Sequence, residues 1–200
     1  MNIRLSASAP AGEQNFAIRP YPGELIETLQ WQGRTLTLRP IRPEDEAQHM
    51  SFLTRLDPED IRMRVFYSRR SIEHAELAHL VQINYEREMA FIAVAHEPDD
   101  SSGTEQTLGV VRAVADPDNR DAEFGIIIRS DLKGQGLGQL MMDKLIRYLR
   151  AHGTHRLVGT VLQENRPMRA LAQRLGFVEG KSVADDALRD IYLDLQSPPT

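Results

Sequence analysis

The sequence contains no cysteine, which excludes disulfide bonds, thiolate metal sites and a covalent acyl-cysteine intermediate. No apolar run approaches the roughly 18 residues of a membrane-spanning helix, and the N-terminal segment lacks the apolar stretch of a secretory signal. Basic residues are not in excess either, because 24 lysines and arginines face 29 aspartates and glutamates, giving a net charge of −5. Domains that bind nucleic acid are normally basic, so this class is disfavoured. A cytoplasmic location is the expectation that these absences leave.

The remaining composition is that of a globular domain. Of the 200 residues, 41% are apolar and 26% are charged, and a chain of this length can bury a core without covalent cross-links. Residues 1–23 are polar and interrupted by three prolines, so we expect them to form a flexible N-terminal arm. Residues 24–200 are expected to form a single domain that begins with a β-hairpin.

Apolar patterns predict the order of the strands and helices. Strands are expected at residues 24–31, 34–41, 89–95, 108–115, 122–129 and 157–162, with two more after residue 177. Helices are expected after Pro43, Ser71, Gly136 and Asn165. The fold class is therefore α/β with a mixed α+β order, which matches neither an alternating doubly wound sheet nor a sandwich.

Two of these helices have apolar faces that predict how they pack. The inner stripe of the helix after Pro43 is expected to be Ala47, Met50, Leu53 and Leu56. The inner face of the helix after Gly136 is expected to be Leu137, Met141, Leu145, Tyr148 and Leu149. Its opposite, polar face is expected to carry Gln139, Asp143, Lys144 and Arg147.

The most informative segment is residues 133–138, Lys-Gly-Gln-Gly-Leu-Gly, which leaves a strand and enters a helix. Glycines allow a positive φ and a close approach of the backbone to a ligand. Successive N–H groups can then point into one space beside the positive end of the helix, which is an arrangement that binds phosphate oxygens. A simple tight turn would need only one or two glycines, whereas three alternate here.

Two common phosphate-binding motifs do not fit this segment. The P-loop pattern G-x-x-x-x-G-K-[ST] is absent from the sequence. The dinucleotide pattern G-x-G-x-x-G, begun at Gly136, would need a glycine where the chain has Met141. That pattern also expects an acidic residue about 20 residues further on, where the chain has Val158.

Residues 126–138 instead resemble the acyl-CoA pyrophosphate motif of GNAT N-acetyltransferases, R/Q-x-x-G-x-G/A, with Lys133 where the family has Arg or Gln. The resemblance extends over about residues 34–195 and includes Asn165 and the helix end at Leu175-Gly176-Phe177. Residues 18–22, 38–45, 87–91 and 129–134 are similar to the GNAT portion of bacterial Pat-type protein-lysine acetyltransferases. Long members of that group also carry an acyl-CoA-synthetase-like domain, which is not part of this sequence.

This resemblance implies a fold and a reaction. The fold would be the GNAT fold, with a central, mixed, partly splayed sheet flanked by helices. The reaction would be direct transfer of an acetyl group from acetyl-CoA to a lysine amine of a protein, without an acyl-enzyme and without a metal. By analogy, acyl-CoA synthetases are a plausible class of protein substrate.

A base is needed because a lysine amine, with a pKa near 10.4, is almost wholly protonated at neutral pH. The resemblance places this base near the middle of the strand before the glycine loop, where Glu123 stands. Partial burial in this apolar strand would raise the pKa of Glu123 and make it a better base. The alternative is a solvated acid, or one paired to Arg112 on the neighbouring strand.

The resemblance also assigns the contacts to acetyl-CoA. Backbone groups of Ile126 and Ile128 are expected to bind the thioester and the pantetheine arm. The pyrophosphate is expected to lie against Gly134, Gln135, Gly136 and Gly138, with Lys133 as a nearby positive charge. Asn165 is expected to contact the pantetheine arm, to cap the following helix, or both. Many GNAT enzymes protonate the leaving thiolate with a tyrosine where this chain has Ala172, so the acid stays open.

Several features have simpler interpretations. Trp31 is expected to pack within the hairpin, and the six histidines show no strong metal-binding spacing. Arg62, Arg64, Arg69 and Arg70 are expected to form a solvated face, with docking of an acidic surface or of the 3′-phosphate of CoA as the alternative. Two other functions also stay open, namely acetylation of a small amine or N-terminal α-amine, and non-catalytic acyl-CoA binding.

Overall fold

The computed structural model describes residues 20–65, 80–96 and 104–196. Within these ranges the chain forms an eight-stranded sheet in the order β1-β2-β3-β4-β5-β6-β8-β7. The strands are β1 (Glu27–Trp31), β2 (Arg34–Pro40), β3 (Glu88–His96), β4 (Glu105–Ala115), β5 (Asp121–Ile128), β6 (Arg156–Leu162), β7 (Val178–Lys181) and β8 (Leu188–Asp194). Neighbouring strands pair antiparallel except β5 and β6, which are parallel. The mixed sheet expected from the sequence is confirmed.

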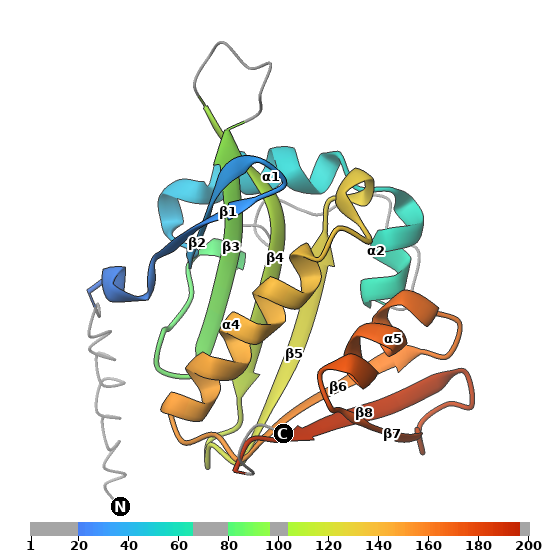
Figure 1. Cartoon of the computed structure of the whole chain (residues 1–200). Helices are drawn as coiled ribbons and strands as arrows, with labels where there is room; N and C mark the ends of the chain where they lie inside the picture. Colours follow the sequence, from blue (N-terminus) through green and yellow to red (C-terminus); the bar gives the residue numbers. More distant parts are fainter. Residues whose placement is uncertain (1–19, 66–79, 97–103, 197–200) are drawn as a thin grey trace, which may run out of the picture.

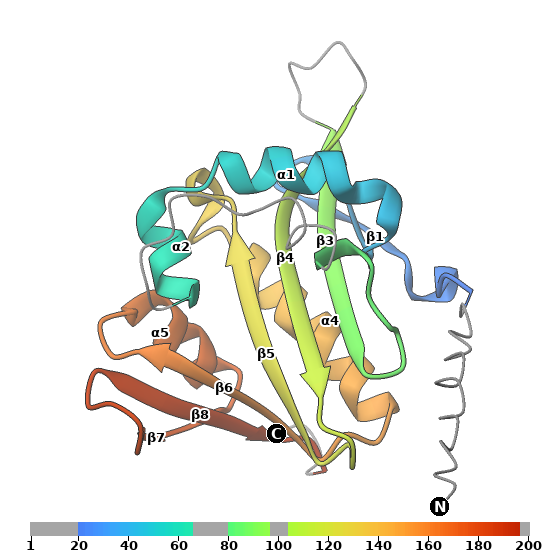
Figure 2. The same ribbon diagram turned by 180° about the vertical axis from the view of Figure 1, so that it is seen from behind.

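Helices cover both faces of this sheet. The helices α4 (Leu137–Ala151) and α5 (Arg166–Arg174) lie on the face that Figure 1 shows in front. The helices α1 (Glu46–Thr54) and α2 (Pro58–Val65) lie on the opposite face, seen in Figure 2. Three short 3-10 helices, η1 (Gly23–Leu25), η2 (Pro43–Asp45) and η3 (Ser130–Leu132), complete the described elements. None of the helices in these ranges combines the length and the apolar character needed to span a membrane.

Strand β3 is the centre of the hydrophobic core because both of its faces are buried. Met89, Phe91 and Ala93 pack with α4 in one apolar cluster, whereas Ala90 and Ile92 pack with α1 in a second cluster on the opposite face. This confirms the sequence prediction that a continuous apolar run marks a strand covered on both faces.

The sheet splits between β5 and β6. The two strands pair only at Asp121↔Arg156, Ala122↔Leu157 and Glu123↔Val158, and then diverge. The divergence begins at Gly159, where the Phe124 ring packs so closely that a Cβ would lie 2.7 Å from its Cε1. The two strands therefore separate into a V, visible in Figure 1, and the expected splayed sheet is confirmed.

The predicted inner stripe of α1 is confirmed at Leu56, which is buried, and at Leu53, which packs against the core, but it was wrong at the start of the helix. Ala47 is exposed, whereas His49 and Phe52, which were not predicted, are buried. The cause lies just before the helix, where the buried Asp45 lies 2.7 Å from Arg39 Nη2. This buried ion pair fixes the start of the helix, so the residues at helical spacing from Asp45 face the sheet. The sequence could not predict that the carboxylate of Asp45 would point into the core, because a charged side chain is expected to face solvent.

The expected polar face of α4 also needs a correction, because Lys144 is buried. Its Nζ donates to Leu25 O at 2.6 Å, lies 2.9 Å from Glu27 Oε1 and sits 4.7 Å from the centroid of the Phe91 ring. Burial lowers the pKa of Lys144, and the Glu27 carboxylate opposes that shift. The lysine thus ties α4 to the start of the hairpin rather than facing solvent.

Parts of the sequence prediction fall at the limits of the described residues. Residues 1–19 of the expected arm lie outside the described residues, and so does the start of the helix expected after Ser71. The last residues of the expected arm are not free, because Tyr21 Oη donates to Pro40 O at 2.9 Å. Helix α2, which covers the start of the arginine-rich stretch after Pro58, was not predicted from the sequence.

The close approach at Gly159 predicts a loss of stability on substitution. Gly159→Ala would press its Cβ against the Phe124 ring, and overpacking of this kind costs about 1–3 kcal/mol. We expect the midpoint of thermal or urea unfolding to fall accordingly. Gly180→Ala on β7, where a Cβ would meet nothing within 4 Å, is the matched control and should unfold like the wild type. Equal stability of both variants would contradict the assigned contact.

Candidate active site

A cleft of about 990 Å³ occupies the space that the divergence of β5 and β6 opens. Its lining includes seven of the residues that the sequence analysis selected: Ile126, Ile128, Lys133, Gly134, Gly136, Gly138 and Asn165. The other two selected residues, Glu123 and Gln135, do not line it. Sequence reasoning missed the wall contributed by Thr160 of β6, by Met168 and Leu171 of α5, and by Glu59 and Asp60 of α2.

The glycine loop forms one end of this cleft. Gly134 and Gly136 have φ values of +74° and +85°, a region that residues with a side chain rarely adopt. Gly136 is the N-cap of α4. The first helical hydrogen bond runs from the backbone N–H of Leu140 to Gly136 O at 3.2 Å. The preceding N–H groups of the first turn have no intrahelical acceptor. They can therefore bind an anion at the positive end of the helix.

Gly138 has a different physical role from the other two glycines. A Cβ at this position would lie 3.4 Å from Leu171 Cδ2 and 3.9 Å from Ile126 Cδ1. The absence of a side chain lets α4 begin close to α5 and β5, which sets the width of the cleft beside the loop.

The backbone of β5 presents polar groups to the cleft. Arg129 N–H donates to Leu108 O of β4, and donors alternate along an antiparallel strand. The N–H groups of Ile127 and Gly125 therefore face β4, whereas those of Ile126 and Ile128 face the opposite side, away from β4. Pairing with β6 ends at Glu123, so this side of the strand borders the cleft.

Lys133 is held in place by α2. Its Nζ contacts Asp60 Oδ1, while Ser130 Oγ donates to Asp60 Oδ2 at 2.6 Å. Asp60 is buried at 9% exposure, whereas the side chain of Lys133 is half exposed. The ammonium group thus keeps a fixed position at the cleft with room to contact a second anion.

Trp31 also positions the loop, beyond the hairpin packing expected for it. It is buried, and its indole Nε1–H donates to Gln135 O at 3.0 Å. The Gln135 side chain turns back to the loop, where Nε2 donates to Asp131 O at 3.2 Å. These contacts explain why Gln135 does not line the cleft, and they show a bond between residues 104 positions apart that no local pattern could predict.

The opposite wall of the cleft is fixed by a cap and by an ion pair. Asn165 Oδ1 accepts from Met168 N–H at 3.1 Å, which confirms the helix cap predicted for Asn165. Arg62 of α2 lies 2.6 Å from both Glu59 Oε1 and Glu164 Oε1. Arg62 therefore links α2 to the loop before α5. The side chains of Arg64, Arg69 and Arg70 lie outside the described residues.

Glu123 stands where β5 and β6 separate. It is exposed, so the expected partial burial was wrong; the divergence of the strands leaves this position open to solvent. Arg112 is not its partner, because Arg112 contacts Glu88 and Leu80 O and lies opposite Gly125 in the register. Within the described ranges the Glu123 carboxylate makes no ion pair or hydrogen bond.

The family follows from comparison with known proteins. Residues 35–178 match the family model described as an acetyltransferase (GNAT) domain. The chain belongs to the GNAT acetyltransferase family. It is therefore an acetyl-CoA-dependent acyltransferase, as the resemblance of the glycine loop implied.

Two related sequences support this assignment. A Pseudomonas aeruginosa protein named as an acetyltransferase is 32% identical over 167 residues, which are 84% of this chain and 87% of that protein. The acetyltransferase Pat of Mycolicibacterium smegmatis is 28% identical over 166 residues, which are 80% of this chain and 45% of Pat. This GNAT acetyltransferase chain thus matches less than half of the length of Pat.

Solved structures show the same fold. The GNAT domain of S. lividans PAT superposes with a TM-score of 0.76 at 18% identity, covering 88% of this chain and 99% of that one. Spermidine N-acetyltransferase from Vibrio cholerae, in complex with CoA and spermine, superposes with a TM-score of 0.62 at 22% identity, covering 80% of this chain and 95% of that one. At these low sequence identities, the two structures support only the fold of this GNAT acetyltransferase and not its acceptor.

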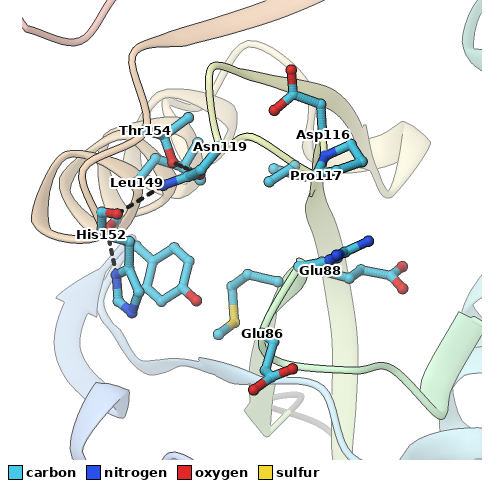
Figure 3. A pocket seen from close by; sticks show the side chains of 13 residues that line it. Glu86, Glu88, Asp116, Pro117, Asn119, Leu149, His152 and Thr154 are labelled. Carbon is cyan, nitrogen blue, oxygen red and sulfur yellow. Dashed lines mark hydrogen bonds between the residues drawn. The ribbon is translucent and has the colours of Figure 1, made fainter.

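A second pocket, of about 250 Å³, lies at the far end of α4 (Figure 3). Tyr148 lines this pocket and is not among the residues that line the cleft. Several of its polar groups bond one another: Asn119 Oδ1 accepts from Thr154 Oγ1 at 2.8 Å, and Asn119 Nδ2 donates to His152 O at 2.9 Å. None of the glycine-loop residues of the GNAT acetyltransferase borders this pocket.

The bond between Trp31 and the loop predicts a local change in order. Trp31→Phe keeps an aromatic ring in the hairpin but removes the Nε1–H donor, so one hydrogen bond worth about 0.5–1.5 kcal/mol is lost. We expect lower backbone order parameters at Gln135 and Gly136 in NMR relaxation of the purified acetyltransferase. The glycine turn at Gly176 serves as the internal control and should be unaffected. Unchanged values at Gln135 would contradict the positioning role of Trp31.

Proposed function

We propose that this acetyltransferase transfers the acetyl group of acetyl-CoA to lysine side chains of proteins, with Glu123 as the general base. The lysine acceptor is supported by the similarity of the sequence to Pat-type protein-lysine acetyltransferases and by the match to Pat itself. The single observation that carries the chemistry is the position of Glu123 in the last residue pair before β5 and β6 separate, next to Phe124, where the lining of the cleft begins. Acyl-CoA synthetases are the proposed substrate class by analogy, and the cytoplasm, which supplies acetyl-CoA, is the proposed location.

The cleft has the properties that a long phosphorylated thioester requires. The two glycines with positive φ turn a run of backbone N–H groups toward the space at the start of α4, and Lys133 adds a positive charge there. We assign the pyrophosphate to Gly134, Gln135, Gly136 and Gly138, with the Gln135 contribution coming from its backbone. The apolar side chains of Ile126, Ile128 and Leu171 suit the pantetheine arm, and Asn165 lies at its side.

The residues of β5 supply the proposed catalytic groups. When bound, acetyl-CoA supplies an activated acetyl thioester. Glu123 accepts a proton from the lysine ammonium group, directly or through a water molecule, and leaves a neutral amine able to attack the thioester carbon. A backbone N–H of Ile126 or Ile128 donates to the oxygen that becomes negative during this attack. The chain offers Ala172, buried on α5, where relatives have a tyrosine, so we assign the proton of the leaving thiolate to solvent.

The phosphate cradle predicts a selective loss of CoA affinity. Gly136→Asp would place a carboxylate in the loop, where it repels the pyrophosphate. We expect calorimetry to give a dissociation constant for CoA that is higher by roughly tenfold or more. Gly153→Asp is the matched control, because Gly153 also has a positive φ and open space around it but ends α4 at the far side. Both variants should lose similar stability. Unchanged CoA binding by Gly136→Asp would reject the loop assignment.

The role of Glu123 predicts a loss of turnover without a loss of binding. Glu123→Gln keeps the shape of an exposed side chain but removes the base, so acetyl transfer should fall by about 10²–10⁴-fold. The measurement is mass spectrometry of acetyl-lysine in a heat-treated bacterial lysate incubated with labelled acetyl-CoA and either form. CoA affinity should be unchanged.

The same assay separates the other functions. Transfer to polyamines but not to protein lysines would favour a small-amine acceptor. No transfer by either form, with CoA still bound, would favour a non-catalytic acyl-CoA-binding module and would overturn the proposal.

A further inference from the structure

A single row of side chains crosses the sheet through Glu123. The register pairs Val114 of β4 with Glu123, Glu123 with Val158 of β6, Val158 with Tyr192 of β8, and Tyr192 with Val178 of β7. Directly paired residues point to the same face of a sheet. We call the four apolar members, Val114, Val158, Tyr192 and Val178, the apolar row. It spans four strand spacings, roughly 19 Å, which is the length of about six extended residues.

Three of the four members of the apolar row are exposed, and Val158 is half-buried. Val114, Tyr192 and Val178 are 46%, 42% and 51% exposed, and they are three of the five large apolar side chains that are exposed in the described part of the chain. The row lies on the face that carries α1 and α2. Glu123, Gly125 and Ile127 point to the same face of β5, and Ile127 packs against the apolar cluster that contains Phe52 of α1. Figure 2 shows that α1 and α2 lie near the other end of this face. Exposed apolar side chains that gather along one line of a sheet, here interrupted only by Glu123, indicate a surface that binds a partner.

The charges around the apolar row favour a basic partner. On the same face, β5 carries the carboxylates of Asp121 and Glu123, and β8 carries those of Asp190 and Asp194. Arg156 faces them and lies 2.7 Å from Asp121 Oδ1, whereas Arg112 of β4, on the same face, is already paired with Glu88. Four carboxylates against one guanidinium leave this part of the face negative, which complements a segment that carries a lysine.

The apolar row is continuous with the cleft. Glu123 occupies the row between Val114 and Val158, and the next residue on its side of β5 is Gly125, which lines the cleft. Because Gly125 has no side chain, it places only backbone atoms between Glu123 and the cleft. A lysine seated at Glu123 could therefore extend toward the cleft, while its neighbours in the chain lie over the apolar row.

We infer that the apolar row is the docking surface for the acceptor, an extended protein segment whose lysine reaches Glu123 and whose flanking residues are apolar. This inference rests on the proposed function. It names the feature that distinguishes a protein acceptor from a free amine, since a free amine would use Glu123 and the cleft but not Tyr192 or Val178.

The test compares three acceptors under steady-state conditions. They are a heptapeptide with a central lysine flanked by leucine and valine, the same peptide flanked by serine and glycine, and Nα-acetyl-lysine methylamide. The wild type should acetylate the apolar peptide with a kcat/KM about tenfold above that for the polar peptide. Tyr192→Ser and Val178→Lys should remove this preference. Neither substitution should change kcat/KM for the methylamide or the affinity for CoA.

Val183→Lys is the matched control, because Val183 is fully exposed, lies outside the apolar row and receives the same added charge. It should keep the peptide preference. Retention of the preference in Tyr192→Ser and Val178→Lys, or an equal loss for all three acceptors, would overturn the inference. A change from dimer to monomer with the preference intact would assign the row to self-association instead. Failure of the proposed function is distinguishable, because the wild type would then acetylate none of the three.

Discussion

β5 and β6 run side by side for three residue pairs and then separate, and the rest of the site depends on this separation. Two packed parallel strands would satisfy each other's backbone groups, whereas here the N–H groups of Ile126 and Ile128 face open space. Where the separation begins, the Phe124 ring packs against Gly159 in the place that a side chain would need. The cleft is therefore a property of packing between two strands rather than of a loop laid over the surface.

The walls of the cleft are joined to distant parts of the chain. Trp31 of the hairpin holds Gln135, Asp60 of α2 holds Lys133, and Arg62 of α2 links to Glu164 before α5. The first of these bonds is neutral, and the second joins a half-exposed lysine to a buried carboxylate. The third is an ion pair among side chains that are all substantially exposed, and such pairs contribute at most about 1 kcal/mol. The glycine loop is thus joined to α2 more firmly than α2 is joined to the loop before α5.

The two faces of the sheet have different chemical characters at the site. The side of α4 and α5 offers glycine backbone, a helix N-terminus and apolar side chains, which suit a phosphorylated thioester. The opposite face offers Glu123 within an exposed apolar row and an excess of carboxylates, which suit a basic protein segment. A transfer between two large molecules benefits from this arrangement because each can approach from its own side and meet at the apex of the V.

The sequence by itself determined the strands, the mixed order, the glycine loop and the cap at Asn165, because these depend on apolar periodicity, on positive φ and on side chains that bond their own neighbours. It also indicated the family, through the spacing of residues 133–138. The inward turn of Asp45 and Lys144, the solvent exposure of Glu123 and the hold of Trp31 on the loop were decided only by the tertiary structure. Each of these depends on a partner many positions away or on the divergence of two strands, and local patterns carry no information about either.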